Sequence, residues 1–197
     1  MSNTLDDQPV RTIGEDLAEG CRRRSCAAYQ RLFEMHGARM KNLAYHILGN
    51  TADAEDAVQE AFIKIYRAAD RFKGDSAFLT WVFRIVVNTC HDQMRRHRRH
   101  RVELQESEST DVLASLPQPT PRDHPLRISL EKSLKKLDQR SRTVFLLYEV
   151  EGFKHREIAE VLRIPEGTSK NILFNARKEL QELLSEAGSL VRPSNEN

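Results

Sequence analysis

Residues able to bind nucleic acid recur with helical spacing in the segment from Phe72 to Arg101. An aromatic ring, an amide and cationic groups form one stripe: Trp81, Arg84, Asn88, His91 and Arg95. Groups of these types can stack on an unpaired base, hydrogen-bond its edge and hold phosphates. The same spacing also fits a solvated helix face on which Trp81 is half buried at the margin of a core. The stripe is therefore a candidate nucleic-acid surface with a structural alternative.

The end of this segment is rich in arginine. Five arginines follow one another within a few residues: Arg95, Arg96, Arg98, Arg99 and Arg101. Like charges at this density repel one another unless a polyanion neutralises them. The cluster favours the nucleic-acid interpretation of the stripe that leads into it.

A second stripe of the same segment is apolar. It consists of Leu79, Val82, Val86, Cys90 and Met94. Steps of three and four residues predict that a helix beginning near Phe78 lies on a hydrophobic core. Gly74, Asp75 and Ser76 interrupt the pattern and predict a loop before this helix. One helix would thus combine a structural face with a reading face.

Composition limits the classes of protein to consider. The 197 residues suffice for one large or two small domains, and 39% hydrophobic with 30% charged residues fit a globular chain with a large surface. The formal net charge is only +2, so the basic character is local. Basic clusters balanced by acidic segments predict several distinct contact surfaces rather than indiscriminate nucleic-acid binding.

Missing signals exclude other classes. No apolar run approaches the ~20 residues that span a bilayer, and the N-terminus lacks the order of a signal peptide, so we expect a cytoplasmic protein without direct membrane insertion. No P-loop, G-x-S-x-G, H-E-x-x-H or metal-site spacing occurs, so we expect no catalytic residue, metal, cofactor or small-molecule substrate. Cys21, Cys26 and Cys90 form no C-x-x-C motif and are expected to be reduced thiols without an assigned role.

Helical spacing dominates the residues before the arginine-rich helix. Residues 1–13 are polar and are expected to form a tail. From Glu15 to Leu48 apolar residues recur at helical steps, and Gly37 is expected to mark a joint between two helices. Thr51 is expected to cap the next helix, which runs from Asp53 to Ala68.

The helix from Asp53 to Ala68 has two faces. Its core stripe consists of Ala54, Val58, Ala61, Phe62 and Ile65. The other face mixes acidic and polar residues with apolar bulk: Asp56, Gln59, Glu60, Ile63 and Tyr66. Ile63 and Tyr66 are either marginal core residues or part of a protein-docking surface.

A change in composition separates the chain into two parts. Residues 102–125 contain four prolines and several acidic residues without helical spacing, which predicts an extended, flexible linker. A second helical unit follows, with an apolar stripe through Leu126, Leu130, Leu134 and Leu137. Asp138 is expected to cap the next helix, which ends at Gly152.

Two short helices near the C-terminus form a helix-turn-helix pattern. The first runs from Lys154 to Leu162, and the second from Thr168 to Leu184 after the bend RIPEG. The second helix of such a pair enters the major groove, and its candidate readers are Thr168, Ser169, Lys170, Asn171, Phe174, Asn175, Arg177 and Lys178. Its core residues would be Ile172 or Leu173, with Ala176 and Leu180. Many small helical domains share this pattern without binding DNA.

Three segments in this order resemble an extracytoplasmic-function (ECF) sigma factor of the sigma-70 family. They are DAEDAVQEAF from Asp53, FKGDSAFLTWVFRIVVNTC from Phe72 and EIAEVLRIPEGTSK from Glu157. The resemblance implies an all-α protein of two small helical domains joined by a flexible linker. The expected parts are a tail (1–13), region 2 (14–101), an acidic proline-rich linker (102–122), region 4 (123–187) and a second tail (188–197).

The resemblance also implies partners and a role for each surface. The residues that would dock on bacterial core RNA polymerase are Asp53, Glu55, Asp56, Gln59, Glu60, Ile63 and Tyr66. Those that would open the minus-10 element of promoter DNA and hold an unpaired base are Lys73, Asp75, Ser76, Trp81, Arg84, Asn88, His91, Arg95, Arg96 and Arg99. The helix-turn-helix would read the minus-35 element. An anti-sigma factor and a role in a stress or envelope response are implied in the same way.

The chain departs from the pattern of the family in three places. Lys154 replaces the usual Ser or Thr cap of the first helix of the helix-turn-helix. Arg163 replaces glycine in the turn, where a left-handed conformation disfavours a side chain. The second helix reads NILFNAR, where many relatives carry more arginine, so the base preference of the family cannot be carried over. Within it, Phe174 is either an apolar contact to a thymine methyl or a core residue. The competing interpretation of the whole chain is a stand-alone helix-turn-helix regulator that binds DNA as a dimer.

Overall fold

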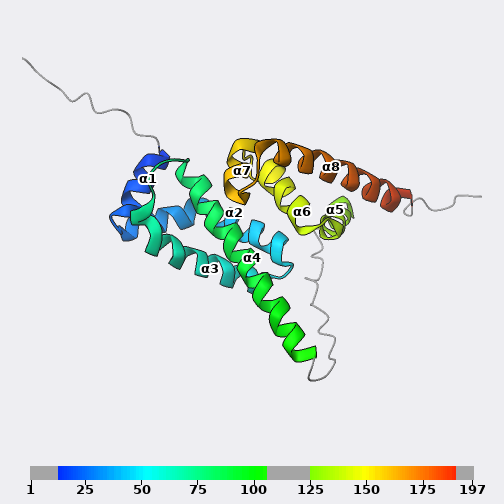
Figure 1. Ribbon diagram of the computed structural model, residues 1–197, viewed down its shortest axis with the longest axis horizontal. Coiled ribbons are helices and arrows are strands. Elements are labelled where there is room, and N and C mark those ends of the chain that lie inside the picture. Colours follow the sequence, from blue (N-terminus) through cyan, green and yellow to red (C-terminus); the bar gives the residue numbers. More distant parts are fainter. Residues whose placement is uncertain (1–12, 106–124, 190–197) are drawn as a thin grey trace, which may run out of the picture.

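The computed structural model describes residues 13–105 and 125–189, and all regular structure in these ranges is helical (Figure 1). The predicted all-α class is therefore confirmed. The first unit consists of α1 (Ile13–Arg22), α2 (Cys26–Leu48), α3 (Thr51–Ala68), the 3-10 turn η1 (Ala69–Arg71) and α4 (Phe78–Gln105). The second consists of α5 (Pro125–Lys136), α6 (Gln139–Phe145), the π-helical turn η2 (Leu146–Val150), α7 (His155–Leu162) and α8 (Glu166–Ser189). None of the helices described is long and apolar enough to cross a membrane.

The core of the first unit lies between α2, α3 and α4. The predicted apolar stripe of α4 supplies its centre, because Val82, Val86 and Cys90 are fully buried. Leu79 and Met94, at the two ends of that stripe, are half-buried and pack against the core. The last turns of α4, which carry the arginine cluster, project beyond the other helices (Figure 1).

The core of the second unit is built from α5, α6, α7 and α8. Asp138 caps α6 as predicted, because its carboxylate accepts hydrogen bonds from the backbone N–H groups of Arg140 (2.8 Å) and Ser141 (3.1 Å). On α8, Leu173, Ala176 and Leu180 are buried, which resolves the choice between Ile172 and Leu173 in favour of Leu173.

Several predicted boundaries were wrong. Gly37 is not a joint, because α2 runs unbroken through it. The Phe33 ring lies where a Cβ at position 37 would meet it, and the chain turns instead before Ser25. Asn50 caps α3 in place of Thr51, since its side-chain oxygen accepts a hydrogen bond from the Asp53 backbone N–H (2.8 Å).

Helices occupy both ends of the segment 102–125, which lacks helical spacing in the sequence. Helix α4 continues past Arg101 to Gln105, and Pro125 is the first residue of α5, where a proline lacks only a hydrogen bond that the helix does not use. The remaining prolines and the acidic residues from Glu106 onward lie outside the described residues, as do both predicted tails apart from Ile13 and the end of α8.

The cysteines differ in accessibility, which predicts selective alkylation. Cys21 and Cys90 are fully buried, and burial raises the pKa of Cys21 to about 11 and that of Cys90 to about 12. Cys26 is exposed at the start of α2. We expect iodoacetamide at about pH 8 to label Cys26 alone, with all three labelled in denaturant, as measured by peptide mass spectrometry. Equal labelling rates in the folded chain would contradict the described packing.

Candidate functional site

The loop before α4 and the first turns of that helix enclose a cavity of about 300 Å³. Gly74 has a positive φ of 80°, which lets the loop turn back toward the helix. The cavity is lined by Arg71, Phe72, Lys73, Asp75, Ser76, Trp81, Arg84 and Glu160. Five of these, all but Arg71, Phe72 and Glu160, are residues that the sequence singled out for an unpaired base.

Trp81 lies between the aromatic core and the cavity. Its ring packs against Phe72 and Phe78, with centroids 5.5 and 5.7 Å away, and only 9% of the residue is exposed. The same residue lines the cavity beside Arg84, which is half-buried. The aromatic cluster therefore holds Trp81 at the wall of the cavity.

The predicted reading stripe does not continue into the cavity. Asn88 is exposed one turn beyond it, and His91 lies at a different cavity of about 590 Å³ between α4 and α6. Burial lowers the pKa of the His91 imidazole, and Arg95 acts in the same direction. The lowered pKa favours the neutral imidazole of His91 in the free chain.

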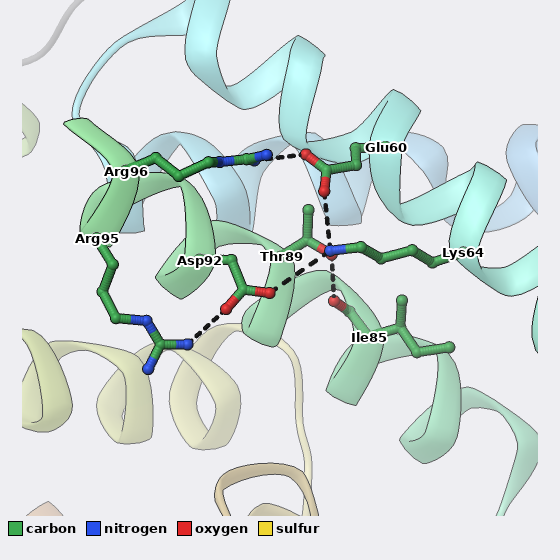
Figure 2. Close-up of polar contacts among 7 residues, drawn as sticks. All are labelled: Glu60, Lys64, Ile85, Thr89, Asp92, Arg95 and Arg96. Carbon is green, nitrogen blue, oxygen red and sulfur yellow. Dashed lines mark hydrogen bonds and ion pairs between the residues drawn. The ribbon is translucent and has the colours of Figure 1, made fainter. Parts of the chain in front are cut away.

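The arginine cluster is partly neutralised by carboxylates of the chain itself. Figure 2 shows Arg96 bound to Glu60 of α3 (2.6 Å) and Arg95 bound to Asp92 one turn earlier (2.5 Å). These arginines lower the pKa of both carboxyl groups. Among the side chains that the structure describes, Arg98 and Arg99 are exposed without a carboxylate partner.

Lys64 joins the two helices at the centre of this network. Its ammonium group lies between Glu60 (2.9 Å) and Asp92 (3.6 Å) and donates a hydrogen bond to the Thr89 hydroxyl (3.1 Å) (Figure 2). The Thr89 hydroxyl in turn donates to the Ile85 carbonyl (2.8 Å). The network was invisible in the sequence because Lys64 and Asp92 are far apart along the chain, and it pairs a predicted polymerase-docking residue, Glu60, with a predicted DNA ligand.

The outer face of α3 carries exposed apolar residues. Ile63 is 51% exposed and Tyr66 43%, which excludes the alternative that they are core residues. The patch extends onto α2 through Tyr29, whose ring lies 5.3 Å from that of Tyr66, and through Phe33, which is 54% exposed. The sequence did not predict that Phe33 belongs to this patch. Helical spacing alone does not show whether a neighbouring helix covers an apolar residue or leaves it exposed.

The acidic residues at the start of α3 differ in how they are held. Asp53 accepts a hydrogen bond from the Asn50 side-chain amide (2.6 Å), and Glu55 pairs with Lys41 of α2 (2.8 Å). Asp56 and Gln59 are exposed. The exposed side chains of Asp56 and Gln59 and the apolar patch together form a surface of the kind that binds another protein.

Helices α7 and α8 form the predicted helix-turn-helix. Lys154 stands at the N-cap of α7 without a side-chain bond, and the Glu157 carboxylate accepts from its backbone N–H (2.8 Å). On α8, Phe174 is 69% exposed and is therefore not a core residue. Ser169 is fully buried and shares a hydrogen bond with His155 Nδ1 (3.0 Å), so it presents no accessible group to a ligand and we leave it out of the reading face.

The remaining predicted readers lie on or near the exposed side of α8. Lys170, Asn171, Phe174, Asn175, Arg177 and Lys178 are exposed, and Thr168 is half-buried. Lys170 pairs with Glu166 (2.8 Å). Arg177 pairs with Glu149 and lies over the Tyr148 ring, 5.4 Å from its centroid.

Arg163 adopts the left-handed conformation expected of a glycine, with φ 54° and ψ 52°. This conformation costs a residue with a Cβ about 1–2 kcal/mol. We expect Arg163→Gly to raise the free energy of unfolding by about 1 kcal/mol, after the greater flexibility of glycine in the unfolded chain is included, as measured by urea denaturation. Arg163→Ala keeps the strain and serves as the control; a gain with alanine equal to that with glycine would contradict this account.

The fold defines a two-unit helical protein whose second unit is a helix-turn-helix, and family models agree with this division. The model of sigma-70 region 2 matches residues 32–100, and that of sigma-70 region 4 matches residues 127–180. The RNA polymerase sigma-H factor of Pseudomonas aeruginosa is 33% identical over 187 residues, which cover 88% of this chain and 96% of the relative. The ECF RNA polymerase sigma-E factor of Haemophilus influenzae is 36% identical over 138 residues, covering 66% and 73%.

Comparison with solved structures indicates the same family. The sigma factor RpoE in complex with the anti-sigma factor NepR, from Bartonella quintana, matches with a TM-score of 0.67 and 28% identity over 79% of this chain and 95% of that one. CnrH in complex with the cytosolic domain of CnrY matches with a TM-score of 0.65 and 27% identity over 87% and 96%. The chain belongs to the sigma-70 family and is an RNA polymerase sigma factor of the ECF type. These findings favour the sigma-factor interpretation over that of a stand-alone regulator.

Proposed function

We propose that this sigma factor binds bacterial core RNA polymerase, opens specific promoters at a minus-10 element and reads a minus-35 element with its helix-turn-helix. The observation that carries the proposal is the cavity beside Trp81, where an aromatic wall, a hydroxyl and cationic groups converge. Extruding a base costs a few kcal/mol, and a rigid pocket with stacking offsets that cost. The functional units are region 2, close to residues 14–101, and region 4, close to 123–187, joined through 102–122.

Core polymerase would dock on the outer face of α3. The exposed apolar groups of Ile63 and Tyr66 would enter the interface, and Asp56 and Gln59 would lie at its rim. Asp53, Glu55 and Glu60 are already paired within the chain, so they contribute by shaping the surface or by exchanging partners.

Single-stranded DNA of the minus-10 element would enter the cavity and continue along α4. Ser76 and Trp81 would hold the extruded base, while Lys73 and Arg84 neutralise its phosphates. Asn88 would contact the next nucleotide from its exposed position, and Asp75 lies at the mouth as a hydrogen-bond acceptor. The adjoining DNA backbone would meet the arginines at the end of α4, of which Arg99 is exposed. Arg95 and Arg96 would first have to break their ion pairs with Asp92 and Glu60.

Region 4 would read duplex DNA with α8, and two variants separate its contacts. We expect Lys170→Ala to lower the salt slope of binding by about one unit for all sequences, because Lys170 would touch a phosphate. Phe174→Ala should change base preference at one position by about 1–3 kcal/mol while the salt slope stays constant, because Phe174 would touch a thymine methyl. Fluorescence anisotropy on duplex variants at several salt concentrations measures both. Identical effects of the two variants would contradict these roles.

An anti-sigma factor is a further proposed partner, since the sigma factor RpoE of Bartonella quintana is seen in complex with the anti-sigma factor NepR. We infer a cytoplasmic location, where polymerase acts, a role in a stress or envelope response, and no catalytic activity of the chain itself. Among the described residues, no group of three His, Cys, Asp or Glu side chains is placed to hold a metal ion.

Transcription in vitro tests the proposal. The protein is added to bacterial core polymerase on a library of genomic upstream fragments, and transcript starts are mapped by sequencing. Specific starts that share two spaced elements are expected. If no specific starts appear while the same polymerase is active with another sigma factor, the proposal is wrong and a stand-alone regulator becomes the better interpretation.

A further inference from the structure

The cavity of about 590 Å³ at His91 lies between α4 of the first unit and helices α6 and α7 of the second. It shares no lining residue with the cavity beside Trp81. Its volume is within the range of about 300–1,000 Å³ that is usual for pockets that hold small organic ligands. Neither the proposed docking surface on α3 nor the proposed reading face of α8 accounts for this cavity.

Cationic side chains from two helices line the cavity. Arg95 and Arg98 belong to α4, and Arg140 belongs to α6. The single carboxylate at the wall, Asp138, already accepts hydrogen bonds from the backbone of α6. Arg95 pairs with Asp92 (2.5 Å), whereas Arg98 and Arg140 are exposed and have no partner among the carboxylates that the structure describes. Positive groups that share one cavity repel one another unless an anion lies between them, so the cavity favours an anionic ligand.

The chemistry of these groups indicates phosphate. A guanidinium group presents parallel N–H donors that match two oxygens of one phosphate group. His91 adds a further polar group, because its Nε2 atom is buried without a hydrogen-bond partner in the described part of the chain. A neutral imidazole still donates from one ring nitrogen, so a phosphate oxygen at this wall would supply the missing acceptor.

The rest of the wall is apolar or uncharged, which a bare phosphate ion would not use. Met94 and Leu162 line the cavity, are half-buried and pack against the core. The Met94 thioether is of a kind that makes favourable contacts with aromatic rings. Gln139 carries a side-chain amide, which both donates and accepts hydrogen bonds. Such a wall fits a flat heterocyclic base with polar edges.

We propose that this cavity is a binding site for a nucleoside polyphosphate. Arg98 and Arg140 hold the phosphate groups from two sides, Met94 and Leu162 contact the base, and Gln139 hydrogen-bonds its edge. The site takes residues from both units, so neither the arginine-rich end of α4 nor the second unit forms it alone. The inference does not depend on the proposed roles of the other surfaces.

Competition binding with the full chain tests the class of ligand. The probe is GTP with a fluorescent N-methylanthraniloyl group on its ribose, and its anisotropy is followed at about 150 mM salt to screen weak surface contacts. We expect unlabelled GTP or ATP to displace the probe, and guanosine and inorganic tripolyphosphate to compete at least about 10-fold less well. Tripolyphosphate that competes equally would show that no base is bound and would overturn the nucleotide assignment. No competition by GTP or ATP at millimolar concentration would overturn the site.

Two single variants locate the ligand. We expect Arg98→Ala and Arg140→Ala each to weaken GTP binding by about 10-fold or more, since each removes a charge-assisted contact to phosphate. Arg140→Lys keeps the charge without the fork of donors and should recover part of the affinity. Arg31→Ala is the matched control, because Arg31 is an exposed arginine of α2 that does not line the cavity.

Thermal unfolding without ligand verifies that each variant is folded, which is expected because the replaced side chains are exposed. GTP should also raise the unfolding temperature of the wild type and of Arg31→Ala more than that of Arg140→Ala. Weaker binding by Arg98→Ala with wild-type binding by Arg140→Ala would place the nucleotide on the end of α4 alone and overturn the cavity site. Equal loss in Arg31→Ala would show unspecific binding of anions to surface arginines and would overturn it as well.

Discussion

Arg84→Ala is expected to lower the rate of promoter opening about 10-fold or more while binding to core polymerase stays unchanged. Arg84 is half-buried at the wall of the cavity beside Trp81, where a charge-assisted contact to DNA contributes about 1.5–3 kcal/mol. Its removal leaves the aromatic cluster in place. Permanganate reactivity of unpaired thymines in the polymerase complex measures opening, and a pull-down with core polymerase measures docking.

The choice of Arg84 over Trp81 follows from burial. Trp81→Ala should impair opening as well, but it also removes a ring packed on Phe72 and Phe78 and would destabilise region 2 by about 3–5 kcal/mol. Loss of activity in that variant would therefore have two causes. Arg23→Ala serves as the control, because Arg23 is an exposed arginine paired with Glu19 away from the cavity. Unchanged opening by Arg84→Ala would show that the cavity does not hold promoter DNA.

The second large effect is expected at the polymerase-docking face. Ile63→Asp should weaken binding to core polymerase by about 100-fold, because a carboxylate without a partner would be buried where an apolar anchor contributes at least about 2 kcal/mol. Ile63 is 51% exposed in the free chain, so the substitution should leave the free energy of unfolding nearly unchanged.

Ile63→Leu is the matched control for this variant, since it keeps an apolar group of the same volume. Affinity is measured by fluorescence anisotropy of labelled sigma factor titrated with core polymerase, and folding by thermal unfolding. Wild-type affinity in Ile63→Asp would move the docking site off α3, whereas equal loss in both variants would point to altered packing of α3 rather than to a lost anchor.

Features that depend on neighbours along the chain could be predicted from the sequence. Periodicity identified the helices and the buried stripe through Val82 and Val86. An aspartate at the start of a helical pattern identified Asp138 as a cap. The left-handed strain at Arg163 followed from the position of glycine in the family. Boundaries were weaker, because Asn50 and Thr51 are both competent caps and only the backbone decides between them.

Periodicity tells which residues share a face but not what covers that face. For that reason the sequence placed Ser169 among the readers, although α7 buries it, and left Phe174 undecided, although it is exposed. The pairing of Arg96 with Glu60 and the seating of Phe153 on Phe83 join residues that are distant in the chain.

The sequence by itself thus determined the helices, their apolar stripes and the family of this protein, because these depend on residue types at local spacings. Tertiary structure alone decided which polar groups are already paired and that α7 lies over the proposed minus-10 cavity. Both depend on contacts between helices, whose free energy comes from burial and charge pairing across segments that no local pattern relates.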